Sequence, residues 1–179
     1  MSRAFVKDDA DRENVVVTHR APLADDVPNL VTPAGLAALR RELDAMRAER
    51  SALQGTGEAQ DAVRRLAALA EEIDELEARL ASAQVVQTPA PGTTEVRVGA
   101  TVTVRDVAEA DGPAGRTDRF TIVGVDEADP LEGNVAFTAP VARASLGRHV
   151  GDVVVAEIGA TTRRFRIEAV DYGATRGDG

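Results

Sequence analysis

Cysteine and tryptophan are absent from this 179-residue chain, and aromatic residues make up only 3% of it. Without cysteine the chain has no disulfide, no thiolate metal site and no cysteine nucleophile, and a reducing compartment is weakly favoured. So few aromatic side chains do not suit one large hydrophobic core. They suit a coiled coil joined to a small β-rich domain.

Long apolar runs are also missing, since no stretch approaches the roughly 20 residues of a membrane-spanning helix. The first twelve residues are too charged for a signal peptide, so we expect a cytoplasmic protein with no membrane partner. Basic residues are outnumbered by acidic ones, 21 to 30, which gives a formal charge of −9. No segment is basic as a whole, which argues against broad binding of duplex nucleic acid.

Two stretches on either side of residues 55–57 carry apolar residues at heptad spacing. If the chain folds back at Gly55-Thr56-Gly57, these residues face one another in mirrored pairs. The pairs are Leu36 with Leu80, Leu43 with Ile73, Met46 with Ala70, and Leu53 with Val63. This pattern predicts an antiparallel two-helix coiled coil over residues 31–86.

The limits of this hairpin follow from capping and composition. Thr32 followed by Pro33 is a strong helix start, so we expect a first helix to about Leu53 and a second over about 59–83. Each arm is then roughly 30 Å long. Charge alternation and prolines predict a disordered tail over residues 1–30, and the Pro and Gly content predicts a linker over 87–94.

From Glu95 onward the apolar period changes to two, which is typical of strands. Five short strands are predicted, around Val102, Ile122, Val135, Val154 and Ile167. One short helix is predicted over 140–147, with Pro140 near its start and Gly147 after its end. The fold class is therefore α+β, with an antiparallel sheet and one short helix over residues 95–173. Residues 174–179 are predicted to be a second disordered tail.

Three stretches, taken in order, resemble the Gre family (GreA/GreB) of bacterial transcription elongation factors. Val31-Thr32-Pro33-Ala34-Gly35-Leu36 resembles the opening of the family's coiled coil, and Leu80-Ala81-Ser82-Ala83-Gln84-Val85-Val86 resembles its close. The third comprises Ile122–Asp129, Ala139–Gly147 and Val150-Gly151-Asp152, which resemble the core of its C-terminal domain. The resemblance implies that this domain is FKBP-like in fold without being a working prolyl isomerase.

The resemblance also implies how the protein acts. In the family the C-terminal domain docks on RNA polymerase at the rim of the secondary channel, and the coiled coil enters that channel. Two acidic residues at its tip help to hold the second Mg²⁺ of the polymerase active site. We therefore expect no cofactor of its own and no enzyme activity of its own. The expected partners are RNA polymerase and the 3′ end of the nascent RNA, and we expect a monomer.

The tip departs from the family pattern, because the family's Asp-x-x-Glu arrangement is absent. Glu58 and Asp61 form a carboxylate pair in reversed order, and the hairpin is about two heptads shorter than the family norm. One interpretation makes this pair the catalytic and Mg²⁺-binding tip. The other is that acidic residues in the first turn of a helix are favoured by the helix dipole alone.

Two further groups of charged residues have both a functional and a structural interpretation. Arg47, Arg50, Arg64 and Arg65 lie on the distal half of the hairpin. They suit either a patch beside the RNA 3′ end or a salt-bridged helix face with Glu49 and Asp61 as partners. Candidates for docking on the polymerase are Asp126, Glu127, Asp129, Pro140 and Arg143, although the acidic ones also suit a plain charged loop.

Three functions therefore stay open. The first is stimulation of transcript cleavage by the polymerase in backtracked complexes. The second is a secondary-channel regulator that does not support cleavage and competes with cleavage factors or alters catalysis or initiation. The third is an unrelated coiled-coil adaptor carried on an isomerase-like domain.

Overall fold

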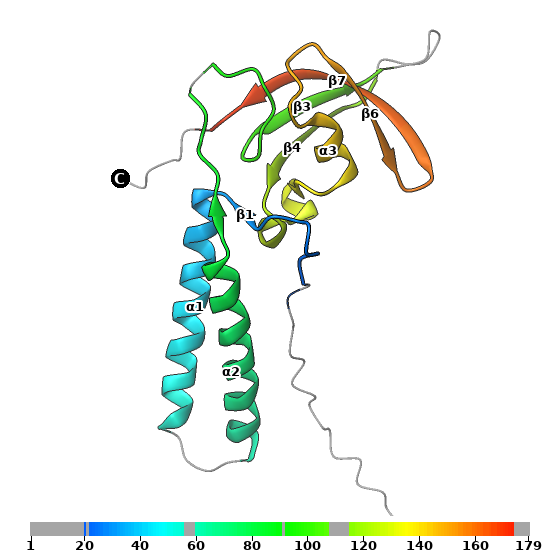
Figure 1. Ribbon diagram of the computed structural model, residues 1–179. Helices are drawn as coiled ribbons and strands as arrows, with labels where there is room; N and C mark the ends of the chain where they lie inside the picture. The colour runs from blue at the N-terminus through cyan, green and yellow to red at the C-terminus, as the bar shows by residue number, and fades with distance from the viewer. Residues whose placement is uncertain (1–19, 21, 56–59, 91, 108–114, 174–179) are drawn as a thin grey trace, which may run out of the picture.

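A computed structural model describes residues 20, 22–55, 60–90, 92–107 and 115–173. A helical hairpin projects from a small sheet domain (Figure 1). The hairpin consists of α1 (Pro33–Gln54) and α2 (Gln60–Ala81), and its base is closed by two short strands, β1 (Leu30–Val31) and β2 (Gln84–Val85). No helix in these described ranges is both long and apolar enough to cross a membrane.

The start of α1 confirms the predicted cap. The Thr32 hydroxyl accepts a hydrogen bond from the backbone N–H of Gly35 at 3.0 Å, and Pro33 is the first helical residue. Proline costs nothing there because its missing N–H would have no helical partner. α1 ends against Gly55, at the predicted break.

The seam between α1 and α2 contains the predicted apolar residues. Leu39, Leu43, Ile73 and Leu76 are buried, and Leu36, Met46 and Leu80 pack against them. The packing is looser towards the tip, where Val63 is 58% exposed. The apolar stripe of each helix is therefore satisfied within one chain over most of the arm.

Residues 22–30 differ from the predicted disordered tail, because they lie against the base of the hairpin. Asn29 is buried, and its side-chain amide donates to the carbonyl of Arg79 at 2.7 Å and to the Ser82 hydroxyl at 3.0 Å. Leu30 and Val31 pair in parallel with Gln84 and Val85. The Asn29 amide thus satisfies the Arg79 carbonyl, which lies in the last turn of α2, where carbonyls lack partners within the helix.

The C-terminal domain is a five-stranded sheet in the order β5-β4-β3-β7-β6. Its strands are β3 (Thr101–Asp106), β4 (Thr117–Val123), β5 (Asn134–Ala136), β6 (Val153–Ile158) and β7 (Thr161–Asp171). The short helix α3 (Pro140–Ser145) packs on one face, over a core that includes Val102, Ile122, Phe165 and Ile167.

The prediction of an all-antiparallel sheet is wrong for one pair, because β5 runs parallel to β4. The connection between them contains two 3₁₀ turns, η1 (Val125–Glu127) and η2 (Pro130–Glu132). These turns carry the chain back before β5 begins, so that β5 runs in the same direction as β4. The sheet is mixed, and the α+β class holds.

Candidate functional site at the tip and base of the hairpin

The hairpin tip carries an exposed carboxylate at the start of α2. The Asp61 side chain is 97% exposed, and its Oδ1 lies 3.8 Å from Nη1 of Arg64. Glu58, the other member of the predicted pair, lies outside the described residues. Within the described ranges, no group of three or more His, Cys, Asp or Glu side chains is arranged to hold a metal ion. Among the described residues at the tip, Asp61 therefore provides one accessible carboxylate.

The best-defined contact near the tip joins Arg65 on α2 to Glu49 on α1. The two nitrogens Nε and Nη2 donate to the two carboxylate oxygens at 2.7 and 3.0 Å, and Nη1 donates to Glu72 at 3.1 Å. The hydrogen bond from Arg65 lowers the pKa of Glu49 below its ordinary value of 4.5. The same bond raises the pKa of Arg65. A two-bond fork of this kind fixes the register of the helices.

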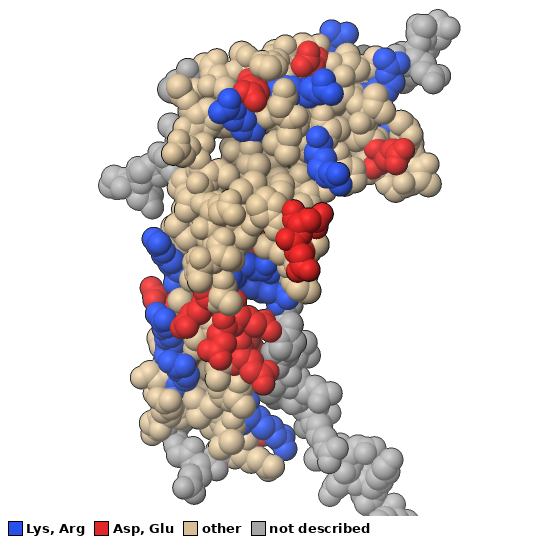
Figure 2. All heavy atoms as spheres, viewed as in Figure 1, with Lys and Arg blue, Asp and Glu red and all other residues tan. Residues whose placement is uncertain are grey.

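The other predicted arginines are mostly engaged in ion pairs. Arg47 donates to Glu77 across the seam at 2.8 Å, and Arg64 faces Asp61. Arg50 forms no ion pair with another described residue. Figure 2 shows acidic side chains gathered over α2 and basic ones along the α1 side of the arm. Three of the four arginines thus help to form a salt-bridged surface of the hairpin.

At the base of the hairpin, Glu127 of the C-terminal domain caps α1. Its carboxylate accepts hydrogen bonds from the Thr32 backbone N–H at 2.8 Å, from the Thr32 hydroxyl and from the Gly124 N–H at 3.2 Å. A Cβ added at Gly35 would lie 2.0 Å from the Glu127 Cδ, so glycine makes room for this carboxylate. A negative charge at a helix N-terminus is also favoured by the helix dipole.

Asp126 joins the same two parts through ion pairs. Its side chain is 7% exposed, with Oδ2 lying 3.1 Å from Nε of Arg79 at the end of α2. Oδ1 lies 3.4 Å from Arg20, which also pairs with Glu42 of α1 at 2.5 Å. Docking on a partner requires an accessible side chain, and Asp126 is turned inward. In this structure Asp126 and Glu127 hold the hairpin to the sheet domain, and their docking role on the polymerase stays a prediction.

The other three docking candidates are exposed. Asp129 caps η2 by accepting the Leu131 N–H at 3.0 Å, Pro140 begins α3, and Arg143 projects from it. A surface hollow of about 470 Å³ lies between α3 and the N-terminal segment. It is lined by Asp26, Val27, Pro28, Phe137, Thr138, Arg143 and Leu146. For Asp129, Pro140 and Arg143 the docking role on the polymerase stays a prediction.

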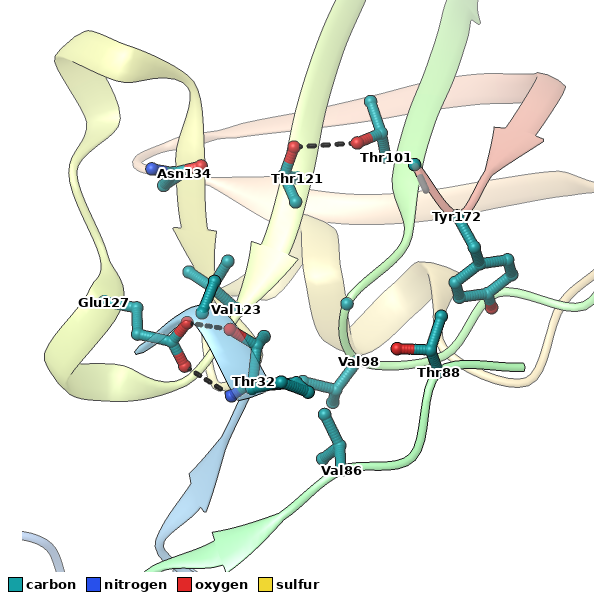
Figure 3. Close-up of a pocket in the computed structure, with 14 residues that line it drawn as sticks. Thr32, Val86, Thr88, Val98, Thr101, Thr121, Val123, Glu127, Asn134 and Tyr172 are labelled. Atoms are coloured by element: carbon teal, nitrogen blue, oxygen red, sulfur yellow. Dashed lines mark hydrogen bonds between the residues drawn. The ribbon is translucent and has the colours of Figure 1, made fainter. Parts of the chain in front are cut away.

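A pocket of about 360 Å³ lies between the base of the hairpin and the sheet (Figure 3). Inside it, the hydroxyls of Thr101 and Thr121 bond to each other at 2.9 Å. Glu127 is its one charged residue among the described ones, and its carboxylate points at Thr32. The lining residues are Thr32, Pro33, Ala34, Val86, Thr88, Val98, Gly99, Thr101, Thr121, Val123, Glu127, Asn134, Tyr172 and Gly173. This composition suits a packing gap, in which the Glu127 carboxylate is already engaged by Thr32 and Gly124.

Comparison with known proteins places the chain in a family. Residues 91–172 match the family described as "Transcription elongation factor, GreA/GreB, C-term". Transcription elongation factor GreA of Desulfovibrio desulfuricans is 33% identical over 159 residues, a match that covers 82% of this chain and 95% of that protein. The chain belongs to the GreA/GreB family.

Other relatives of this Gre-family chain match over shorter stretches. GreA of Hyphomonas neptunium is 38% identical over 100 residues, which span 56% of this chain and only 60% of that protein. Among solved structures, GreA factor homolog 1 of Thermus thermophilus is 23% identical. That match covers 81% of this chain and 99% of the other, with a TM-score of 0.37.

The sequence did not predict which residues join the two parts of this Gre-family chain. Arg20, Asn29 and Arg79 carried no local signal, since their partners lie 50 or more residues away or in another element. The signals available were indirect. Gly35 stands inside the first turn of a helix, where a glycine is costly without a packing reason.

Proposed function

We propose that this Gre-family chain binds RNA polymerase and modulates elongation from the secondary channel. The polymerase, assisted by the hairpin, then cleaves the transcript in backtracked complexes. The observation that supports this proposal is the arm itself. Helices of 22 residues extend about 33 Å from the sheet domain, and they carry the exposed Asp61 carboxylate at the far end.

In this proposal Asp61 is a metal ligand that the hairpin supplies to the polymerase active site. Mg²⁺ prefers carboxylate oxygens and keeps several waters, so one accessible carboxylate can complete a metal site that is mostly built elsewhere. The contact with Arg64 at 3.8 Å is long and exposed, and such pairs are worth little. Asp61 is thus free to turn toward a metal ion held by the polymerase, with Glu58 as its predicted companion.

The runner-up is a secondary-channel regulator that does not support cleavage. The feature that favours it is the shortened arm, since a hairpin about two heptads shorter than the family norm ends farther from the polymerase active centre. Such a protein binds the polymerase and blocks a genuine cleavage factor.

Transcript cleavage in a stalled, backtracked complex of the cognate polymerase separates the two. The proposal predicts faster release of short 3′ RNA fragments across a Mg²⁺ titration. Replacing both Glu58 and Asp61 with alanine should abolish this stimulation while leaving binding to the polymerase intact. Asp74→Ala is the matched control, because Asp74 is an exposed acid on α2 away from the tip.

Each other outcome has a definite meaning. No stimulation by the natural chain, together with inhibition of an added cleavage factor, supports the runner-up. Unchanged stimulation by the double variant shows that the tip carboxylates are not the ligands. Failure of the natural chain to bind the polymerase contradicts both functions.

A further inference from the structure

The outer edge of the sheet carries an unusual share of exposed apolar surface. Seven large hydrophobic residues are exposed in the described part of the chain, and four of them lie between residues 150 and 158. They are Val150, Val153, Val155 and Ile158, with exposures of 42, 40, 55 and 40%. Single exposed apolar residues are ordinary on a surface. Val153 and Val155, however, share the exposed face of one strand, because side chains alternate along it.

β6 is an edge strand, and its outer side is open. It pairs with β7 alone at the margin of the sheet (Figure 1). The linker covers the chain just before it, where the Val150 N–H donates to the Thr94 carbonyl at 3.2 Å. Among the described residues nothing pairs with the outer side of β6. The strand contains one charge, Glu157, and neither lysine nor proline, which are the usual protection of an exposed edge.

The ladder shows which backbone groups face the open side. The Ile167 N–H donates to the Asp152 carbonyl, and the Val107 N–H donates to the Arg164 carbonyl, both at 2.9 Å. The backbone of Arg164 thus faces β3, and its partner Val155 faces away from β7. Because direction alternates along a strand, Val153, Val155 and Glu157 present their N–H and C=O groups to the open edge.

The side chains of β7 that lie next to these valines are basic. Val153 and Val155 lie opposite Arg166 and Arg164 of β7, and both arginines are exposed. Neither forms an ion pair with another described residue, whereas Arg105 on the neighbouring strand is paired with Glu168. Since cross-strand partners share a face of the sheet, two exposed guanidinium groups lie beside Val153 and Val155, and the one on Arg166 also interacts electrostatically with Glu168.

We propose that β6 is a docking edge for an extended, acidic segment of a partner protein, which adds a sixth strand to the sheet. Main-chain hydrogen bonds to the open edge provide affinity, as in other cases of strand addition. Carboxylates on the outer face of the added strand then meet Arg164 and Arg166. This inference stands independently of how the hairpin acts on the polymerase.

The test uses the full-length ¹⁵N-labelled chain and two synthetic hexapeptides, one alternating glutamate with valine and the other lysine with valine. The acidic peptide should slow amide exchange at Val153, Val155 and Glu157. It should bind about tenfold more tightly than the lysine peptide, since two exposed charge contacts contribute roughly 1.4 kcal/mol. Equal binding of the two peptides, or no protection of these three amides, overturns the proposal.

Two variants sharpen the result. Val155→Pro removes one donor on the open edge without breaking a bond to β7, and it should weaken binding of the acidic peptide, whereas the control Val155→Thr should not. If Val155→Pro unfolds the chain, the double variant Arg164→Ala with Arg166→Ala still tests the charge, and it should abolish the preference for the acidic peptide.

Protection that grows with protein concentration in the absence of peptide means that a second copy occupies the edge. A preference for a single-stranded oligonucleotide means a nucleic-acid surface, and both results contradict the proposal.

Discussion

Glu127 is the residue on which the joint between hairpin and sheet domain depends most directly. Its carboxylate accepts hydrogen bonds from Thr32 and from Gly124, which lie on the two different parts. The hydroxyl of Thr32 both donates to Glu127 and accepts from the Gly35 N–H, so the helix cap and the joint are one network. Losing the carboxylate leaves several part-buried donors without an acceptor.

Glu127→Ala is therefore expected to lower the free energy of unfolding by about 2 kcal/mol, the usual cost of losing hydrogen bonds to a charged group. Denaturant titration followed by circular dichroism measures this change. Glu132→Ala is the matched control, because Glu132 is exposed in the next turn, and it should change stability little. Equal effects of the two substitutions would mean that the network contributes nothing.

Gly35 offers a second test of the same contact. An alanine there places its Cβ 2.0 Å from the Glu127 Cδ and displaces the carboxylate. Gly35→Ala should be destabilising in the natural chain, but it should cost much less when Glu127 is already alanine. A double-mutant cycle measures this coupling, and simple additivity of the two substitutions would contradict the contact.

At the scale of elements, the hairpin is held by an apolar seam, and ion pairs across the seam add to its stability. The Arg65 fork lowers the pKa of Glu49, so the charged form of Glu49 is favoured in the folded chain. A carboxyl group with a lowered pKa in the folded state stabilises it above the unfolded pKa. That contribution is lost as the pH falls through the folded value.

The natural chain should therefore lose more stability between pH 7 and pH 3 than the variant Glu49→Gln. The difference is small, about 0.5 kcal/mol, because Glu49 is 44% exposed and the pair is screened by solvent. Thermal unfolding at the two pH values measures it, with Glu71→Gln as a control exposed on the same arm. Identical pH profiles for Glu49→Gln and the natural chain would show that the fork does not stabilise the hairpin.

Local signals in the sequence were sufficient for the elements but not for the joint between them. Thr32-Pro33 and the heptad stripe specify the hairpin because capping and periodicity act over a few residues. The bond from Thr32 to Glu127 joins residues 95 apart, and nothing in either neighbourhood indicates the other. The parallel β4–β5 pair was missed for a related reason. Two 3₁₀ turns in the connection carry the chain back before β5 begins, so that β5 runs in the same direction as β4.

At the scale of the whole molecule, two distant segments converge on Asp126. Arg20 from the N-terminal segment and Arg79 from α2 both face its buried carboxylate, and Arg20 continues to Glu42 on α1. Together with the Glu127 cap, these contacts set the direction in which the hairpin leaves the sheet domain. A hairpin held in this way can present its tip at a fixed distance from a docked C-terminal domain.

Whether the hairpin tip reaches the polymerase active centre can be measured directly, because the chain contains no cysteine. A single cysteine at Gln60, an exposed residue at the start of α2, can carry an iron chelate that generates hydroxyl radicals. In a backtracked complex, the Gln60→Cys conjugate should cut the nascent RNA near its 3′ end. A conjugate at Ala160→Cys, in the β6–β7 turn, should not. Polymerase binding without RNA cutting from position 60 would show that the tip does not reach the active centre.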